Sequence, residues 1–407
     1  MPDRLAVLSL HTSPLAQPGS GDGGGMNVYV RSLTAALGRA GVPSDVYTRA
    51  ESPADPPAVA LDTGVVVRHV VAGPAEPVPK DALPDLVDEF VAAVRREMQT
   101  AGQEPSLIHA NYWLSGVAGH ALKHDLDVPL VSTFHTLSRV KAEAGAGDDP
   151  ALRARREAEI VRCSDLILAS TAGESVQLTR LYDADPSRIE VVPPGVDHRR
   201  FFPGDADGAR AALALSGRRV LLFAGRVQPL KGLSLAVRTL AELDDRDVAL
   251  VVVGGPSGPE GTSELEAARQ LAEDLAVGSQ VRFVPPQPHA RLAVYYRAAD
   301  VCIVPSRSES FGLVALEAAA SGTPVVAAAV GGLRSLVVDD VTGFLVEGRD
   351  PADYARPVAA LLDDPRRAAE MGARAEVRSR RYSWDMTAAR LRRLYADLVA
   401  GALVECR

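Results

Sequence analysis

Residues 191–213 have the sequence VVPPGVDHRRFFPGDADGARAAL, and this stretch divides the chain into two parts. Its prolines and glycines interrupt any continuing helix or strand. On either side of it, short runs rich in valine, leucine and isoleucine alternate with longer amphipathic stretches. Such runs predict strands buried on both faces, and their alternation with helices predicts parallel sheets. We therefore place a domain boundary at Gly195–Asp205 and expect an α/β unit on each side.

The expected elements follow the same order in both parts. The expected strands are Leu5–Leu10, Asp45–Thr48, Val65–Val70, Leu107–Ala110, Leu130–Thr133, Leu166–Ala169 and Ile189–Val192, then Arg219–Ala224, Val248–Val253, Val281–Val284, Val301–Val304 and Val325–Ala328. The expected helices include Leu83–Met98, Leu152–Cys163, Ser234–Leu243, Ser263–Leu275, Ala290–Ala298, Gly312–Ala320 and Trp384–Ala400. This order predicts two tandem doubly wound, Rossmann-like domains that face a cleft, with ligands beyond the carboxyl ends of the strands.

Composition excludes several classes of protein. The 407 residues carry 44 Lys plus Arg against 52 Asp plus Glu, a net charge of −8, which argues against a nucleic-acid partner. No uninterrupted apolar run approaches the length of about 18 residues that a membrane span needs, and the N-terminus shows no cleavage signal, so we expect a cytoplasmic protein. The three cysteines have no CxxC spacing, so we expect reduced thiols and neither a disulfide nor a zinc site.

A glycine-rich stretch follows the first expected strand and leads into a helix. Five glycines lie between Gly19 and Gly25. The backbone at Gly23–Gly25 can approach an anion closely at the start of the helix, where amide groups and the helix dipole favour negative charge. The stretch matches GxGxxG only formally and has no GK[ST] sequence, so it indicates a phosphate or diphosphate contact more than a dinucleotide site. A simple glycine-rich turn is the alternative.

Two basic residues stand at the start of the second domain. In the segment Phe223–Gly232, Arg226 and Lys231 follow a strand and precede a helix. An arginine fork binds phosphate oxygens in pairs, and a lysine adds a point charge. We therefore expect this strand exit to stabilise a leaving diphosphate.

Two carboxylates lie eight residues apart after another strand of the second domain. Glu309 falls in the loop after Val301–Val304, and Glu317 falls within the next helix among apolar residues. A buried carboxylate needs a partner, and sugar hydroxyls would serve. The alternative is that Glu317 faces solvent.

A histidine follows a strand of the first domain. His135 comes directly after the apolar strand Leu130–Thr133 and Phe134, and could be a catalytic group or a hydrogen-bonded core residue. No spacing indicates a Ser-His-Asp relay or a resident metal.

Together these segments resemble glycosyltransferase family 4 of the GT-B fold over essentially the whole chain. Glu309 and Glu317 match the EX7E motif of that family, and Arg226 and Lys231 match its diphosphate-binding pair. The segments LSLHTSPLAQPGSGDGGGMNVYV, NYWLSG, GGPSGP and ESFGLVALEA resemble most the members that transfer N-acetylglucosamine from UDP to inositol phosphate, with retention, in a mycothiol-type pathway. The resemblance implies an acceptor-binding domain (1–197), a nucleotide-sugar-binding domain (198–378) and a C-terminal helix (379–407) that crosses back to the first.

The resemblance also implies the site residues. The implied donor-binding residues are His11, Gln17, Pro18, Gly24, Gly25, Arg226, Lys231, Glu309, Phe311, Gly312, Leu313 and Glu317. The implied acceptor-binding residues are Asn27, Lys80, Asn111, Tyr112, Thr136 and Arg155. The implied catalytic residues are His135, Arg226, Lys231 and Glu309. No cofactor is implied other than a Mg²⁺ bound with the nucleotide, no metal ligand is implied, and a homodimer is left open.

Two departures from the family pattern leave a second function open. Asn111 stands in His109-Ala-Asn-Tyr-Trp113 where such members have HSHYW, and Arg334 stands where they have proline. The alternative is a secondary-metabolite glycosyltransferase that uses a donor such as a GDP-sugar and a small thiol such as ergothioneine, in lincosamide-type S-glycosylation. Two further possible functions are a non-catalytic nucleotide-sugar sensor and a phosphorylase.

Overall fold

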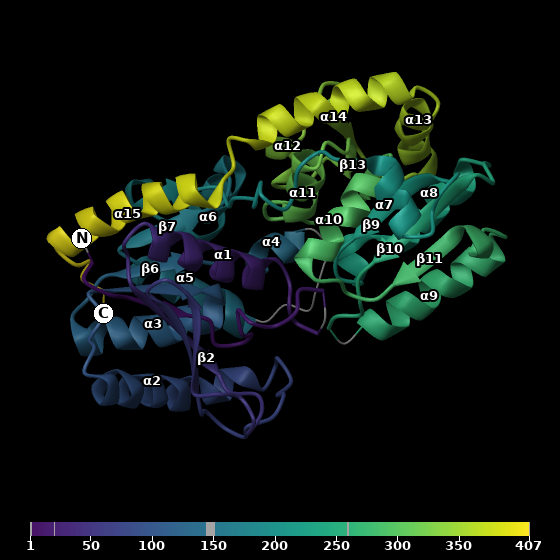
Figure 1. Cartoon of the computed structure of the whole chain (residues 1–407). Helices are drawn as coiled ribbons and strands as arrows, with labels where there is room; N and C mark the ends of the chain where they lie inside the picture. Colours follow the sequence, from purple (N-terminus) through teal and green to yellow (C-terminus); the bar gives the residue numbers. More distant parts are fainter. Residues whose placement is uncertain (1, 20, 144–150, 259, 407) are drawn as a thin grey trace. The chain divides into compact units, whose positions relative to one another are not determined.

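The computed structural model describes residues 2–19, 21–143, 151–258 and 260–406. The chain forms two compact units. Unit 1 comprises residues 1–16, 26–195 and 384–407, and unit 2 comprises residues 17–25 and 196–383. In Figure 1, the yellow helix α15 (Trp384–Ala400) accordingly lies among the purple and blue elements of unit 1. The glycine-rich stretch lies within the expected domain 1–197 but groups with unit 2.

Unit 1 is built on a sheet in the order β3-β4-β2-β1-β5-β6-β7-β8. Its strands are β1 (Leu5–Leu8), β2 (Ser44–Arg49), β3 (Ala58–Asp62), β4 (Val65–Val70), β5 (Leu107–Asn111), β6 (Leu130–Thr133), β7 (Leu166–Ala169) and β8 (Ile189–Val191). All neighbouring strands pair in parallel except β3, which runs antiparallel to β4 at the edge. The sequence did not predict β3, a short edge strand (AVALD) that is only partly buried.

The helices of unit 1 cover both faces of this sheet. They are α1 (Gly25–Arg39), η1 (Leu83–Leu86), α2 (Val87–Ala101), α3 (Tyr112–Leu126), α4 (Ser138–Glu143), α5 (Ala151–Cys163), α6 (Ala172–Tyr182), η2 (Pro186–Arg188) and α15. Along β1, Leu5 and Val7 pack with α1 and α15, whereas Ala6 and Leu8 pack with α2, α3 and α5. Successive side chains of a strand point to opposite faces, so the apolar run of β1 supplies both cores.

Unit 2 has a sheet in the order β11-β10-β9-β12-β13-β14, in which all pairs are parallel. Its strands are β9 (Arg219–Ala224), β10 (Val248–Val253), β11 (Val281–Val284), β12 (Val301–Val304), β13 (Val325–Ala328) and β14 (Gly343–Val346). Its helices are α7 (Ala206–Ala212), η3 (Pro229–Lys231), α8 (Leu233–Glu242), α9 (Gly261–Asp274), η4 (Gly278–Gln280), α10 (His289–Ala298), α11 (Leu313–Ala320), α12 (Leu333–Leu336), α13 (Pro351–Leu362) and α14 (Pro365–Ser379). The order is 3-2-1-4-5-6, that of a doubly wound dinucleotide-binding sheet.

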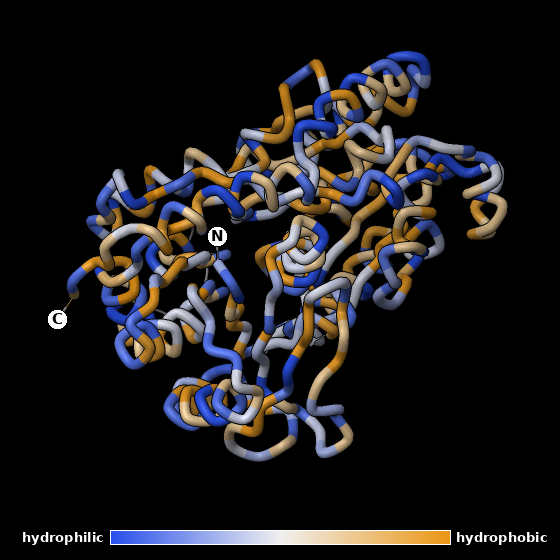
Figure 2. The backbone as a smooth tube through the Cα atoms, turned by 60° about the vertical axis from the view of Figure 1, so that its left-hand side comes forward, coloured by the Kyte–Doolittle hydropathy of each residue, from blue (hydrophilic) through white to orange (hydrophobic). Residues whose placement is uncertain are grey.

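The prediction of two doubly wound α/β domains is therefore confirmed, and β14 is the strand of unit 2 that the sequence did not predict. Figure 2 shows the alternation on which the prediction rested, with apolar segments in orange and hydrophilic segments in blue along the whole chain. Among the described residues, no helix combines the length and the apolar character that crossing a membrane requires.

The expectation of three reduced thiols is wrong for this structure. Cys163, at the end of α5, and Cys406, in the tail beyond α15, form a disulfide with their Cα atoms 5.2 Å apart. Cys302 is free and buried. The two bonded cysteines are 243 residues apart in the sequence, so no local spacing could reveal the pair.

Candidate functional site

Each sheet has a point where the strand order reverses, between β1 and β5 in unit 1 and between β9 and β12 in unit 2. Loops at the carboxyl ends of these strands form the ligand crevice of doubly wound sheets. In unit 2, Arg226 and Lys231 follow β9, and Glu309 follows β12. The fold therefore brings residues of two separate sequence motifs to one switch point.

Lys231 and Glu309 make an ion pair there, with Nζ 2.6 Å from Oε2. Gly232 allows the two loops to approach this closely. It has a φ of 73°, and a Cβ atom on it would lie 2.3 Å from the carbonyl oxygen of Pro305. The backbone of Glu309 is fixed as well, because its carbonyl oxygen accepts a hydrogen bond of 2.9 Å from the amide of Gly332. An ammonium group has three N–H donors, so Lys231 can bind an anion while it stays paired with Glu309.

The glycine-rich stretch lies against Arg226. A Cβ atom on Gly24 would lie 2.8 Å from Nε of Arg226, so the backbone at Gly24 packs closely on the guanidinium group. Gln17 holds the other end of the stretch, since its Nε2 donates to the carbonyl oxygens of Pro18 (3.2 Å) and Gln287 (2.9 Å). Two sequence signals that we had assigned to different domains thus form one candidate phosphate site within unit 2.

The helix α11 begins beside this stretch. A Cβ atom on Gly25 would lie 3.4 Å from Cδ1 of Leu313. Gly312, the residue before the helix, has a φ of 103°, which strains any other residue type. The neighbouring Phe311 is buried and packs edge-to-face on Tyr382. Donor residues implied by the family resemblance therefore lie together at the start of α11.

Glu317 is buried within α11, so the alternative that it faces solvent is wrong. Its Oε2 accepts a 2.9 Å hydrogen bond from the hydroxyl of Tyr296, and its Oε1 lies 3.9 Å from Nε2 of His289. Burial raises the pKa of Glu317 to about 7, although the hydrogen bond from Tyr296 lowers it. A carboxyl with this pKa can accept or donate a hydrogen bond near neutral pH.

In unit 1, Tyr112 is the centre of a cationic cluster. Nζ of Lys80 and Cζ of Arg153 each lie 4.9 Å from the centroid of its ring. The ring of His11 lies 4.4 Å from it, centroid to centroid. Two cations within about 6 Å of one aromatic ring make favourable cation–π contacts and concentrate positive charge at this place.

Arg153 also joins Thr136 to this cluster. Its Nη2 donates to the carbonyl oxygen of Thr136 at 2.8 Å and to Oγ1 at 3.1 Å, and its Nε donates to Glu157 at 2.7 Å. Arg155, which the resemblance implied, is exposed on the same helix. The structure thus brings Lys80, Tyr112 and Thr136 together, but with Arg153 in the place we expected for Arg155. Residues two apart on a helix point in different directions, so Arg153 and Arg155 face different surroundings.

His135 is held as a neutral ring. Its Nε2 donates to Oδ1 of Asn111 at 2.9 Å, and the ring packs edge-to-face on Tyr29. Burial, with a smaller effect of His109, lowers the pKa of His135 to about 3. Its φ of 60° is unusual for a residue other than glycine and indicates a backbone fixed by its surroundings. The histidine is hydrogen-bonded, and its geometry is compatible with either role that the sequence left open.

The C-terminal helix supports this part of unit 1. His109 bridges β5 to α15, because its Nε2 lies 2.8 Å from Oγ1 of Thr133 and its Nδ1 lies 2.9 Å from the hydroxyl of Tyr395. Asn27, another implied acceptor residue, donates to Oγ1 of Thr12 and to the carbonyl oxygen of Ser13, at 2.7 and 2.6 Å. In this structure Asn27 therefore fixes the loop after β1.

Known proteins match both halves of the chain. A family model described as Glycosyltransferase Family 4 matches residues 23–200, and one described as Glycosyl transferases group 1 matches residues 206–378. D-inositol 3-phosphate glycosyltransferase 2 of Catenulispora acidiphila is 48% identical over 97% of this chain and 95% of its own length. The D-inositol 3-phosphate glycosyltransferase of Nocardia farcinica is also 48% identical, over 97% and 89%.

Solved structures agree with the fold. Sucrose-phosphate synthase from Thermosynechococcus elongatus has a TM-score of 0.91 and 34% identity, over 98% of this chain and 99% of that chain. HepE of Anabaena, solved in complex with UDP and glucose, has a TM-score of 0.79 at 19% identity over 97% and 100%, which supports the fold alone. The chain is therefore a GT-B glycosyltransferase and belongs to the family of the D-inositol 3-phosphate glycosyltransferases.

Proposed function

We propose that this chain transfers N-acetylglucosamine from UDP-N-acetylglucosamine to an inositol phosphate, with retention of configuration, in a mycothiol-type pathway. The assignment of the acceptor rests on one observation, the cluster of Lys80 and Arg153 over Tyr112. The Thr136 hydroxyl is bound to the same arginine. Two cations and a hydroxyl are the groups that recognise a phosphate. The names of the relatives from Catenulispora acidiphila and Nocardia farcinica support the same acceptor.

We assign the donor to unit 2. Arg226 and Lys231 bind the diphosphate and stabilise the negative charge that develops as it leaves, because fixed cations aimed at developing charge are the strongest electrostatic catalysts. Glu309 and Glu317 bind hydroxyl groups of the donor, and the backbone at Gly24 and Gly25 lies beside the phosphates. We propose that the reaction requires no cofactor beyond a Mg²⁺ ion that accompanies the nucleotide diphosphate, which a titration of activity with Mg²⁺ and with a chelator would test.

We propose the proton step that the family resemblance implies. A front-face substitution gives retention when the departing phosphate oxygen takes the proton of the attacking acceptor hydroxyl. The sugar–phosphate bond breaks as the bond to the acceptor oxygen forms. His135 lies near the reacting sugar in this proposal, and its neutral ring, whose Nε2 donates to Asn111, can accept a hydrogen bond at Nδ1 without carrying charge.

A panel of donors and acceptors tests the proposal. UDP- and GDP-sugars are each incubated with an inositol phosphate, with unphosphorylated inositol and with a small thiol such as ergothioneine, and products are read by mass spectrometry. We expect a product with UDP-N-acetylglucosamine and the phosphorylated inositol. Transfer to the thiol from a GDP-sugar would overturn the proposal in favour of S-glycosylation, and binding without turnover would indicate a sensor. Sugar-phosphate formation that depends on inorganic phosphate would indicate a phosphorylase.

We further propose that the chain works in the cytoplasm, where its proposed nucleotide-sugar donor is available. Light scattering of the purified protein would show whether it is a homodimer.

A further inference from the structure

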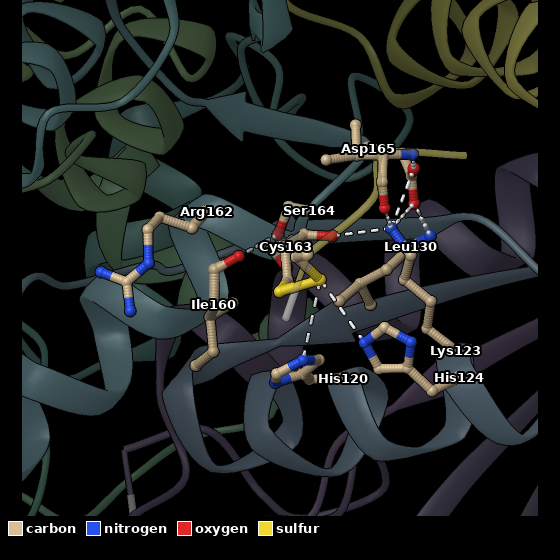
Figure 3. Close-up of a disulfide and its surroundings, with 12 residues drawn as sticks. His120, Lys123, His124, Leu130, Ile160, Arg162, Cys163, Ser164 and Asp165 are labelled. Atoms are coloured by element: carbon tan, nitrogen blue, oxygen red, sulfur yellow. Dashed lines mark hydrogen bonds and ion pairs between the residues drawn. A yellow bond between two sulfur atoms is a disulfide. The ribbon is translucent and has the colours of Figure 1, made fainter. Parts of the chain in front are cut away.

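Four side chains with metal-binding atoms meet in unit 1, at a place that the proposed reaction does not use. His120 and His124 lie on α3, Cys163 ends α5, and Cys406 lies in the tail beyond α15. One ligand atom from each residue lies within 4.8 Å of the others. Figure 3 shows both imidazole rings turned toward the sulfur atoms of the Cys163–Cys406 disulfide. Two cysteines and two histidines are a ligand set typical of structural zinc.

The distances from Cys406 to the two imidazoles suit a tetrahedral ion once the disulfide is reduced. Side chains four residues apart lie on one face of a helix, so His120 and His124 present their rings side by side, with centroids 5.0 Å apart. Sγ of Cys406 lies 3.4 Å from Nε2 of His124 and 3.9 Å from Nε2 of His120. With Zn–S bonds of about 2.3 Å and Zn–N bonds of about 2.0 Å, a tetrahedral site separates sulfur and nitrogen ligands by roughly 3.5 Å.

The tail that carries Cys406 is held by contacts that do not involve sulfur. Lys123 donates from Nζ to the carbonyl oxygens of Cys163 (2.8 Å) and Val404 (3.0 Å). The amide of Val404 donates to Oδ1 of Asp165 at 2.6 Å. Lys123 and Asp165 pair at 2.9 Å, and both are nearly fully buried. These contacts fix Val404 beside α3 and the backbone of Cys163 without using either sulfur.

We propose that the reduced chain binds one Zn²⁺ through His120, His124, Cys163 and Cys406, and that this ion fastens the C-terminal tail to α3 and α5. Each thiol releases its proton to solvent as its sulfur bonds to the ion, and each neutral imidazole donates the lone pair of Nε2. The step needs no oxidant or reductant, because the chain is synthesised with thiols. The disulfide and the zinc site are alternatives, since a sulfur in a disulfide provides no thiolate.

Native mass spectrometry of the full-length protein in a thiol-reducing buffer with added Zn²⁺ tests the proposal. We expect one ion per chain, and an affinity at least 10-fold lower after His124→Ala or Cys406→Ser. His124 is exposed and Cys406 is only half-buried, so neither change opens the core. His69→Ala, on β4, and Cys302→Ser are matched controls that should keep the ion. Co²⁺ in place of Zn²⁺ should give the visible absorption of a tetrahedral site with thiolate ligands in the wild type alone.

Two results would overturn the proposal. One is a wild-type protein that binds no Zn²⁺ in its reduced form, or binds it equally well after His124→Ala. The other is peptide mapping in which Cys163 and Cys406 stay cross-linked under the same reducing conditions, which would make the pair a permanent disulfide.

Discussion

The guanidinium group of Arg153 donates to both the carbonyl oxygen and the hydroxyl of Thr136, at 2.8 and 3.1 Å. The same group lies over the ring of Tyr112 and pairs with the buried Glu157. Four fixed contacts hold this cation in one place, so it does not have to be ordered when a ligand arrives. Pre-positioned charges bind phosphate with a smaller entropy cost than mobile ones.

Arg153, and not Arg155, should therefore bind the acceptor phosphate. Loss of a hydrogen bond to a charged group costs about 1.5–3 kcal/mol, so Arg153→Ala should raise the KM for inositol phosphate by roughly 10- to 100-fold. The KM for the donor should stay within about twofold. Steady-state kinetics with each substrate varied in turn measure both values.

Arg155→Ala is the matched control, because it removes the same charge from the same helix at an exposed position. It should leave both KM values unchanged. Since Arg153→Ala deprives Glu157 of a partner, Arg153→Lys and a thermal melt separate binding from folding. If Arg155→Ala weakens acceptor binding more than Arg153→Lys does, the assignment fails.

The sequence predicted the two α/β units because their strands are continuous apolar runs, such as Val248–Val253. It missed β3 and β14, two short strands at sheet edges whose residues are only partly buried. Within the site, the sequence predicted that the motif residues lie in the loops after β9 and β12, since these residues follow apolar runs. The choice between Arg153 and Arg155 could not, because it depends on the rotation of α5.

Contacts between residues far apart in the chain could not be predicted from the sequence either. The packing of Gly24 on Arg226 joins segments that are about 200 residues apart in the chain, and Cys163 and Cys406 are 243 residues apart. The spacing of His120 and His124 on one helix face was the one local signal of the four-residue cluster. It indicates a metal site only when the cysteines are known to be near.

Lys231→Ala should lower kcat/KM by roughly 10²–10³-fold, the scale of losing one group that stabilises developing negative charge. The ion pair with Glu309 is partly exposed, so its loss should change stability little. Arg238→Ala removes one positive charge from an exposed position of α8 and should keep full activity. A Lys231→Ala enzyme with nearly wild-type turnover would rule out the proposed role in the diphosphate site.

Glu317 should make unit 2 less stable as the pH rises. Its folded pKa of about 7 lies above the ordinary 4.5, so the folded state binds the proton more tightly than the unfolded state does. The stabilisation is present below pH 4.5 and is lost as the pH rises through about 7. Glu317→Gln cannot ionise, so the variant should gain stability relative to the wild type between pH 5 and pH 8.

Hydrogen exchange of peptides from α10 and α11 at pH 5 and at pH 8, corrected for the intrinsic exchange rates, measures this difference in stability between the wild type and Glu317→Gln. Glu347→Gln, an exposed carboxylate paired with Arg334, is the control and should show no such trend. Protection that changes equally with pH in the wild type and in Glu317→Gln would contradict the raised pKa.

His109 should make the stability of unit 1 depend on pH in the opposite direction. The ring lies between Thr133 and Tyr395. Burial lowers the pKa of His109 to about 3, from an ordinary value of 6.5. The unfolded state therefore binds more protons between these values. The stabilisation is fully present above pH 6.5 and is lost as the pH falls toward 3, by up to about 1.4 kcal/mol per pH unit.

Both tryptophans, Trp113 and Trp384, lie in unit 1, so tryptophan fluorescence follows the unfolding of that unit by urea. We expect the wild type to lose about 2 kcal/mol more than His109→Gln between pH 7 and pH 5. The contributions of the other titrating groups to the stability difference cancel in this comparison, because both proteins contain them. His69→Gln, on β4, is the control. An identical loss in the wild type and in His109→Gln would show that His109 takes up its proton within the folded unit, and that the hydrogen-bond chain to α15 does not keep the ring neutral.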